Sequence, residues 1–62
     1  MAILLRESEV LEELSIGRTL LYRLLADGKI ESVKVGRRRL YPRAGLVRFV
    51  EQLQAEQVEG ER

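Results

Sequence analysis

Residues 32–42 read SVKVGRRRLYP, a stretch that predicts a short β-hairpin with a strongly basic tip. Apolar and polar residues alternate before the glycine, the period of a half-buried strand, so we expect Val33 and Val35 to face inward and Lys34 outward. Gly36 and Arg37 supply the turn, and residues 38–41 return as the second strand. Three consecutive arginines then cluster at the tip: Arg37, Arg38 and Arg39. Either a solvated turn or a finger that grips phosphates explains them, and the rest of the chain has to decide.

The end of this hairpin leads directly into a helix. Leu40 and Tyr41 are adjacent, so both cannot face the core of a regular strand. We assign Tyr41 to the core, while the orientation of the hairpin around Leu40 stays open. Pro42 stops the strand and suits the first position of a helix that we expect to run to about Gln54.

This third predicted helix carries the clearest amphipathic stripe in the chain. Leu46, Phe49, Val50 and Leu53 recur at i, i+3, i+4 and i+7. We therefore expect a domain over residues 1–54 and a polar, acidic tail over residues 55–62. The tail either extends the helix or frays, and we expect disorder near its end.

On the other side of the hairpin, a second helix is predicted from Arg18 to about Asp27. Gly28 ends it where a left-handed cap costs least. Its leucines share one side and are predicted to be core: Leu20, Leu21, Leu24 and Leu25. The opposite face has Thr19, Tyr22 and Ala26 at its centre, with Arg18 and Arg23 at its margins. Such a face can approach a groove closely while the longer side chains reach phosphates or base edges.

A first helix is predicted over roughly Glu7–Leu14, with a start uncertain by a few residues. Val10, Leu11 and Leu14 share its apolar face. The break at residues 15–17, Ser-Ile-Gly, is so short that the first two helices cannot lie antiparallel. They are expected to cross steeply, as in a helix-turn-helix.

Composition limits what a chain of 62 residues can do. There is no cysteine and no histidine, which excludes disulfides, a zinc site and an imidazole base. A chain this small has little core to spare for an enclosed catalytic pocket, so we do not expect an enzyme, a cofactor or a small-molecule ligand. No apolar run approaches a membrane span, and the start MAILLRESEV is too quickly charged for a signal peptide. We expect a soluble cytoplasmic protein, associated with the nucleoid of a bacterial host.

The net charge of +1 hides a strong asymmetry. Residues 1–13 and residues 49–62 each balance at −3, whereas residues 14–48 carry nine arginines and lysines against Asp27 and Glu31. A basic centre between acidic ends is typical of a protein with a polyanionic partner. Ordinary mixed surface charge is the alternative.

The chain resembles a known family in two blocks of sequence, YRLLADGKI at Tyr22–Ile30 and VKVGRRRLYPRAGL at Val33–Leu46. From Leu4 to Leu53 the chain resembles the small excisionase-like helix-turn-helix proteins, related to the DNA-binding head of the MerR regulators. Phage excisionases (recombination directionality factors), AlpA-type regulators and compact bacterial transcription factors belong to this family. The resemblance implies a winged helix-turn-helix fold, mainly α with a small β-hairpin, in a single domain.

By this resemblance, the helix at Arg18–Asp27 is a recognition helix for a major groove, and the hairpin tip is a wing. The residues that match family DNA contacts are Arg18, Thr19, Tyr22, Arg23, Lys34, Arg37, Arg38 and Arg39. For Tyr22, a core-rim position with its hydroxyl in water is the alternative. Three positions depart from the family: Arg6 replaces a capping Thr or Ser, Gly17 replaces a capping serine, and Leu40 replaces a polar residue.

The first hypothesis is therefore a sequence-specific binder of double-stranded DNA. An excisionase is favoured over a transcription regulator, because we expect a bare DNA-binding domain with no effector module and no long dimerisation helix. A lone small module buries too little surface for tight selective binding, so copies are expected side by side on repeated sites, bending DNA and assisting an integrase. The second hypothesis is a protein-interaction module that uses the acidic first helix or the tail.

Overall fold

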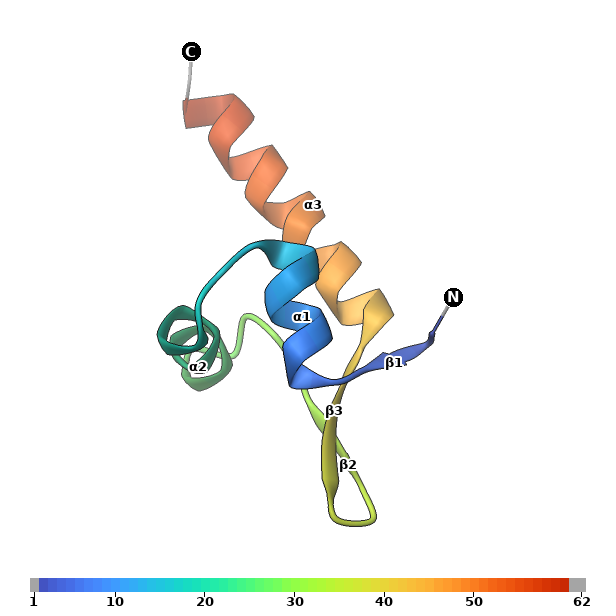
Figure 1. Ribbon diagram of the computed structural model, residues 1–62. Coiled ribbons are helices and arrows are strands. Elements are labelled where there is room, and N and C mark those ends of the chain that lie inside the picture. The colour runs from blue at the N-terminus through green and yellow to red at the C-terminus, as the bar shows by residue number, and fades with distance from the viewer. Residues whose placement is uncertain (1, 61–62) are drawn as a thin grey trace.

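Six elements follow one another within residues 2–60, and Figure 1 shows their arrangement. The computed structural model describes residues 2–60, and the side chains of residues 2–57. The elements are β1 (Leu4–Leu5), α1 (Glu7–Leu14), α2 (Arg18–Ala26), β2 (Val33–Val35), β3 (Arg38–Pro42) and α3 (Arg43–Gly60). The predicted order of two helices, a hairpin and a third helix is confirmed, with one further strand in front. No helix in the described part of the chain is both long and apolar enough to cross a bilayer.

The additional strand converts the hairpin into a three-stranded sheet. The strand order is β1-β3-β2, and both pairings are antiparallel. Leu4 pairs with Pro42 and Leu5 with Tyr41. The backbone N–H of Arg43 also donates to the carbonyl of Ile3 at 2.8 Å. The start of the chain is thereby attached to the strand that leads into α3.

Every element except β2 contributes one side chain to a small core. The buried residues are Leu5, Val10, Leu21, Ile30, Tyr41 and Leu46. Around them pack six partly buried apolar side chains, among them Leu14 and Phe49. Because the members come from every helix, from β1, from β3 and from the α2–β2 connection, burial of this cluster fixes how the elements lie together.

The ends of α1 are capped in an uncommon way. The bounds Glu7–Leu14 are as predicted, and Arg6 occupies the N-cap position. An arginine side chain has no acceptor for the free N–H groups of the first turn. The carboxylate of Glu9 instead reaches back to the backbone N–H of Arg6 at 2.8 Å, which is one half of a capping box. At the other end Ser15 adopts the left-handed conformation, with φ 56°.

The end of α2 is confirmed in detail. Gly28 has φ +74°, and its N–H donates to the carbonyl of Leu25 at 3.1 Å. The N–H of Lys29 donates to the carbonyl of Leu24 at 2.9 Å, which completes a Schellman motif. Of the four leucines predicted to be core, Leu20 is an exception, since it is 43% exposed. A helix of nine residues buries only the stripe that meets its neighbours, and Leu20 lies at the edge of that stripe.

A second prediction, the inward orientation of the two β2 valines, is wrong. Val33 and Val35 were expected to face inward, but they are 39% and 52% exposed. Figure 1 shows the reason: the β2–β3 hairpin extends beyond the helices, so no element covers this face of it. The choice left open at the end of β3 is settled, because Tyr41 is buried and Leu40 only half-buried.

The bounds of the third helix also differ from prediction. Pro42 belongs to β3, where it is paired with Leu4, and the helix starts at Arg43. It continues past Gln54 to Gly60, so that, of the two alternatives left open for the tail, the structure shows extension of the helix as far as Gly60. The run after Leu53 has no apolar stripe but contains strong helix formers (Gln, Ala and Glu), and local propensity extends a helix that packing has already nucleated. Residues 61–62, the end of the predicted tail, lie outside the described residues.

Candidate nucleic-acid interface

The outer face of α2 presents four side chains that the sequence singled out. We call Arg18, Thr19, Tyr22 and Arg23 the contact face of α2, and all four are exposed. Leu21 at the opposite side of the helix is fully buried. Burial of the leucine stripe therefore turns the contact face to solvent. Because Tyr22 is 48% exposed, it is not a core residue.

The hairpin brings its cations together in a defined register. Lys34 on β2 lies directly opposite Arg39 on β3, and Val35 lies opposite Arg38. Because successive strand residues point to opposite faces, Lys34 and Arg39 share one face while Arg38 lies on the other. The consecutive arginines of β3 therefore cannot all make the same contact. Like charges directly opposite one another destabilise a β-hairpin, so the pair of Lys34 and Arg39 does not serve folding.

Arg37 lies at the tip of the hairpin. Gly36 has φ +62°, and Arg37 is not among the residues with positive φ, which is the pattern of a type II′ turn with glycine at its first central position. This two-residue turn places Arg37 at the end of the hairpin, beyond the Val35–Arg38 pair. All four hairpin cations, Lys34 and Arg37 to Arg39, are exposed, and none makes an ion pair within the described residues.

One acidic residue that the sequence did not single out joins the contact face of α2. The carboxylate of Glu7, in the first turn of α1, accepts a hydrogen bond from the Tyr22 hydroxyl at 2.7 Å. The same oxygen, Oε2, accepts from Nε of Arg18 at 3.1 Å. The hydrogen bond to Glu7 raises the pKa of Tyr22 above its ordinary value, since the phenol proton is held between two oxygens. Two of the four contact-face side chains are thus fixed by one carboxylate.

Glu7 also connects the contact face to the base of the hairpin. It follows Leu5 by two residues, and Leu5 pairs with Tyr41 on β3. Burial is the main cause that raises the pKa of Tyr41. The charge of Glu7 raises this pKa further, while Arg39 lowers it. In Figure 1 the start of α1 lies between α2 and the hairpin. The contact face and the wing therefore flank the same end of α1.

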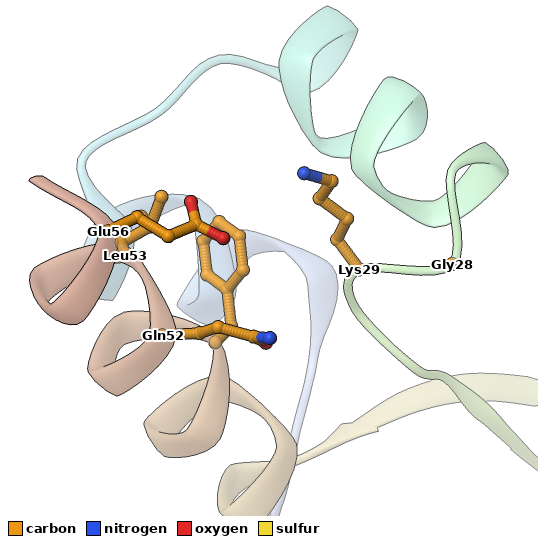
Figure 2. Close-up of a pocket in the computed structure, with 6 residues that line it drawn as sticks. Gly28, Lys29, Gln52, Leu53 and Glu56 are labelled. Atoms are coloured by element: carbon orange, nitrogen blue, oxygen red, sulfur yellow. The ribbon is translucent and has the colours of Figure 1, made fainter. Parts of the chain in front are cut away.

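A separate hollow lies between the end of α2 and the middle of α3. It is lined by Gly28, Lys29, Phe49, Gln52, Leu53 and Glu56. Figure 2 shows Lys29 reaching from the α2–β2 connection toward α3, with Glu56 on the other side of the opening. Its volume of about 240 Å³ is below the roughly 300–1,000 Å³ of typical small-molecule sites. None of the eight predicted contact residues lines this hollow.

Comparison with known proteins agrees with this architecture. A family model described as "Helix-turn-helix domain" matches residues 4–54. The chain belongs to this helix-turn-helix family. In its terms, α1 and α2 are the two helices around the tight turn, and the β2–β3 hairpin is the wing of a winged helix-turn-helix.

One curated relative of this helix-turn-helix domain has a functional name. A protein of Saccharopolyspora erythraea called "Probable excisionase" is 42% identical over 55 residues, which are 89% of this chain and 56% of the relative. The chain thus spans little more than half the length of the relative that it matches. No solved structure matches the chain.

Proposed function

We propose that this helix-turn-helix domain binds double-stranded DNA sequence-specifically, with α2 as the recognition helix and the hairpin as the wing. Membership of the family supports DNA binding as such. The observation that carries the proposal is the cation cluster of the hairpin, in which Lys34 directly opposes Arg39 and no member is ion-paired to another described residue. Such a pair costs folding free energy, and the phosphates of a duplex would offset the repulsion.

The two parts of the proposed interface have different roles. Arg37 at the hairpin tip can clamp a phosphate with two parallel hydrogen bonds, or enter a narrow minor groove where the negative potential is deepest. On α2, the short side chain of Thr19 allows the helix backbone to approach a major groove, and Arg23 is long enough to reach base edges. Phosphate contacts from the wing position the protein, whereas side chains from α2 select the sequence.

We further propose that the biological role is that of an excisionase. The name of the relative from Saccharopolyspora erythraea supports this role over that of a transcription regulator. On this view several copies bind repeated sites side by side, bend the DNA and promote excision by an integrase. A single small domain buries too little surface for tight selective binding by itself, which is why adjacent copies are part of the proposal.

A salt titration tests DNA binding. The chain is titrated with a labelled random-sequence duplex at roughly 50 mM and 200 mM salt, and binding is expected to weaken steeply as counterion release loses its driving force. Replacing Arg37 and Arg38 with alanine should weaken binding to all sequences alike and reduce the salt slope by about 2. Arg48→Ala is the matched control, since Arg48 is an exposed cation on α3, outside the proposed surface and near Glu31.

The same titration distinguishes DNA binding from the second hypothesis, a protein-interaction module. Absence of binding by the wild-type chain at both salt concentrations would overturn DNA binding and favour a protein-interaction module. An equal loss of affinity in the Arg48 variant and the wing variant would place the phosphate contacts elsewhere. For the excisionase role, the test is whether adding the chain shifts integrase products from integration to excision on a supercoiled substrate.

A further inference from the structure

The Glu7 carboxylate accepts hydrogen bonds from two side chains of the proposed DNA interface. Among the described residues it is the one acidic group that bonds side chains of the proposed interface, through the Tyr22 hydroxyl and Nε of Arg18. The other ion pairs, Arg6–Glu9, Arg43–Glu13 and Arg48–Glu31, involve none of the predicted contact residues. The contact therefore needs an explanation of its own.

Carboxylate and phosphate use the same donors on these two side chains. An arginine guanidinium and a tyrosine hydroxyl are common partners of phosphate oxygens in protein–DNA complexes. The hydroxyl has a single proton, so Tyr22 cannot donate to Glu7 and to a phosphate at the same time. A phosphate at Arg18 would also lie close to the Glu7 charge, and like charges at such distances repel.

Resting on the proposed function, we propose that Glu7 is a built-in competitor of DNA phosphate at Arg18 and Tyr22, which DNA must displace in order to bind. Exposure allows the exchange, because the side chains of Glu7 and Arg18 are 32% and 66% exposed. A duplex that offers only phosphate contacts then binds weakly, and contacts to bases are needed to reach full affinity. Glu7 thereby limits the affinity for DNA phosphate from a position outside the recognition helix.

The first test compares two variants with the same change of charge. Glu7→Gln should bind a random-sequence duplex about two- to fivefold more tightly than wild type, the range expected for loss of an exposed ion pair. Its salt slope should be steeper by up to about 0.9, because Arg18 becomes free to pair with a phosphate. Glu12→Gln is the control, since Glu12 is exposed on the same helix and its carboxylate makes no hydrogen bond or ion pair within residues 2–57. The Glu12→Gln control should bind the duplex with an affinity close to that of the wild type.

A second variant separates displacement from a general change of charge. In an Arg18→Ala background, Glu7→Gln should bring a smaller gain, because the cation that Glu7 neutralises is absent and only the Tyr22 hydroxyl is released. An undiminished gain in this background, or a Glu7→Gln variant that binds no more tightly than Glu12→Gln, would overturn the inference. If neither the wild type nor Glu7→Gln binds DNA, the proposed function itself is wrong.

The contact between Tyr22 and Glu7 can also be measured without DNA. Absorbance titration of the phenol groups, with Tyr22→Phe to identify the signal, should show that Glu7→Gln lowers the pKa of Tyr22. Thermal unfolding followed by circular dichroism verifies that each variant is folded. An unchanged Tyr22 pKa would show that the two side chains are not in contact in solution, and the inference would be overturned even if DNA binding is observed.

Discussion

Leu5 on β1 lies directly opposite Tyr41 on β3, and the two side chains are only 2% and 1% exposed. This pair joins the start of the chain to the strand that leads from the wing into α3. Because Leu5 immediately precedes Arg6, the N-cap of α1, its burial also sets where the helix-turn-helix begins relative to the hairpin. A strand of two residues thereby positions both halves of the proposed DNA interface.

The importance of this pair can be tested by truncation. Leu5→Ala is expected to lower the free energy of unfolding by about 2–5 kcal/mol, as for other large-to-small changes in a core. A domain of this length has a total stability of roughly 3–9 kcal/mol, so a large fraction of it would be lost. Urea denaturation followed by circular dichroism measures the change. Ile3→Ala is the control, since Ile3 is 81% exposed, and equal effects of the two changes would contradict this account.

Tyr41 predicts a loss of stability at alkaline pH. Burial raises the pKa of its phenol above the ordinary value of 10.0, so the folded chain retains this proton to a higher pH than the unfolded chain. The contribution to stability is fully present below pH 10 and is lost as the pH rises through the folded pKa. Denaturation midpoints measured below and above pH 10 should fall less in Tyr41→Phe than in wild type. Parallel declines would show that Tyr41 does not titrate differently in the two states.

Ser15 is expected to be a site of backbone strain. It has φ 56° and ψ 46°, a conformation that costs an L-residue about 1 kcal/mol or more and glycine almost nothing. Ser15→Gly should therefore raise the free energy of unfolding by up to about 1 kcal/mol. The complementary change is Gly28→Ala, at φ +74°, which should lower stability by a similar amount. Changes in the same direction at both sites would refute the argument from φ.

The contact face of α2 is expected to control sequence preference. Thr19→Ala and Arg23→Ala should each change which sequences are selected from a random duplex library, by about 1–3 kcal/mol for a base that is directly contacted. The salt slope should change little for Thr19→Ala, because this residue carries no charge. The comparison variant is Arg37→Ala on the wing, which should weaken all sequences alike. If helix and wing variants gave the same selected sequences and the same affinities, the proposed division of roles would be wrong.

Local patterns were sufficient to predict much of the fold. The bounds of α1, the stop of α2 at Gly28 and the turn at Gly36 depend on periodicity and on the low cost of positive φ in glycine, which are properties of short segments. The basic tip and the polar face of α2 could be recognised for the same reason. Exposure of all eight predicted contact residues follows from that patterning.

Other features depended on which elements cover one another. Alternation at Val33 and Val35 predicted an inward face, but the hairpin extends past the helices and that face stays exposed. The pairing of Leu5 with Tyr41 joins residues far apart in sequence, and two leucines give too short a signal for a strand.

The sequence by itself determined the helix-turn-helix order, the cationic wing and the solvent-facing side of α2, because each depends on residues within a few positions of one another. The tertiary structure decided that Glu7 bonds Tyr22 and Arg18, from 15 and 11 residues away. No periodicity relates these positions. In the sequence, Glu7 is simply a glutamate in the first turn of a helix, where it suits the helix dipole. Its charge lies on the proposed DNA-binding surface because α1 packs against α2 in the folded chain.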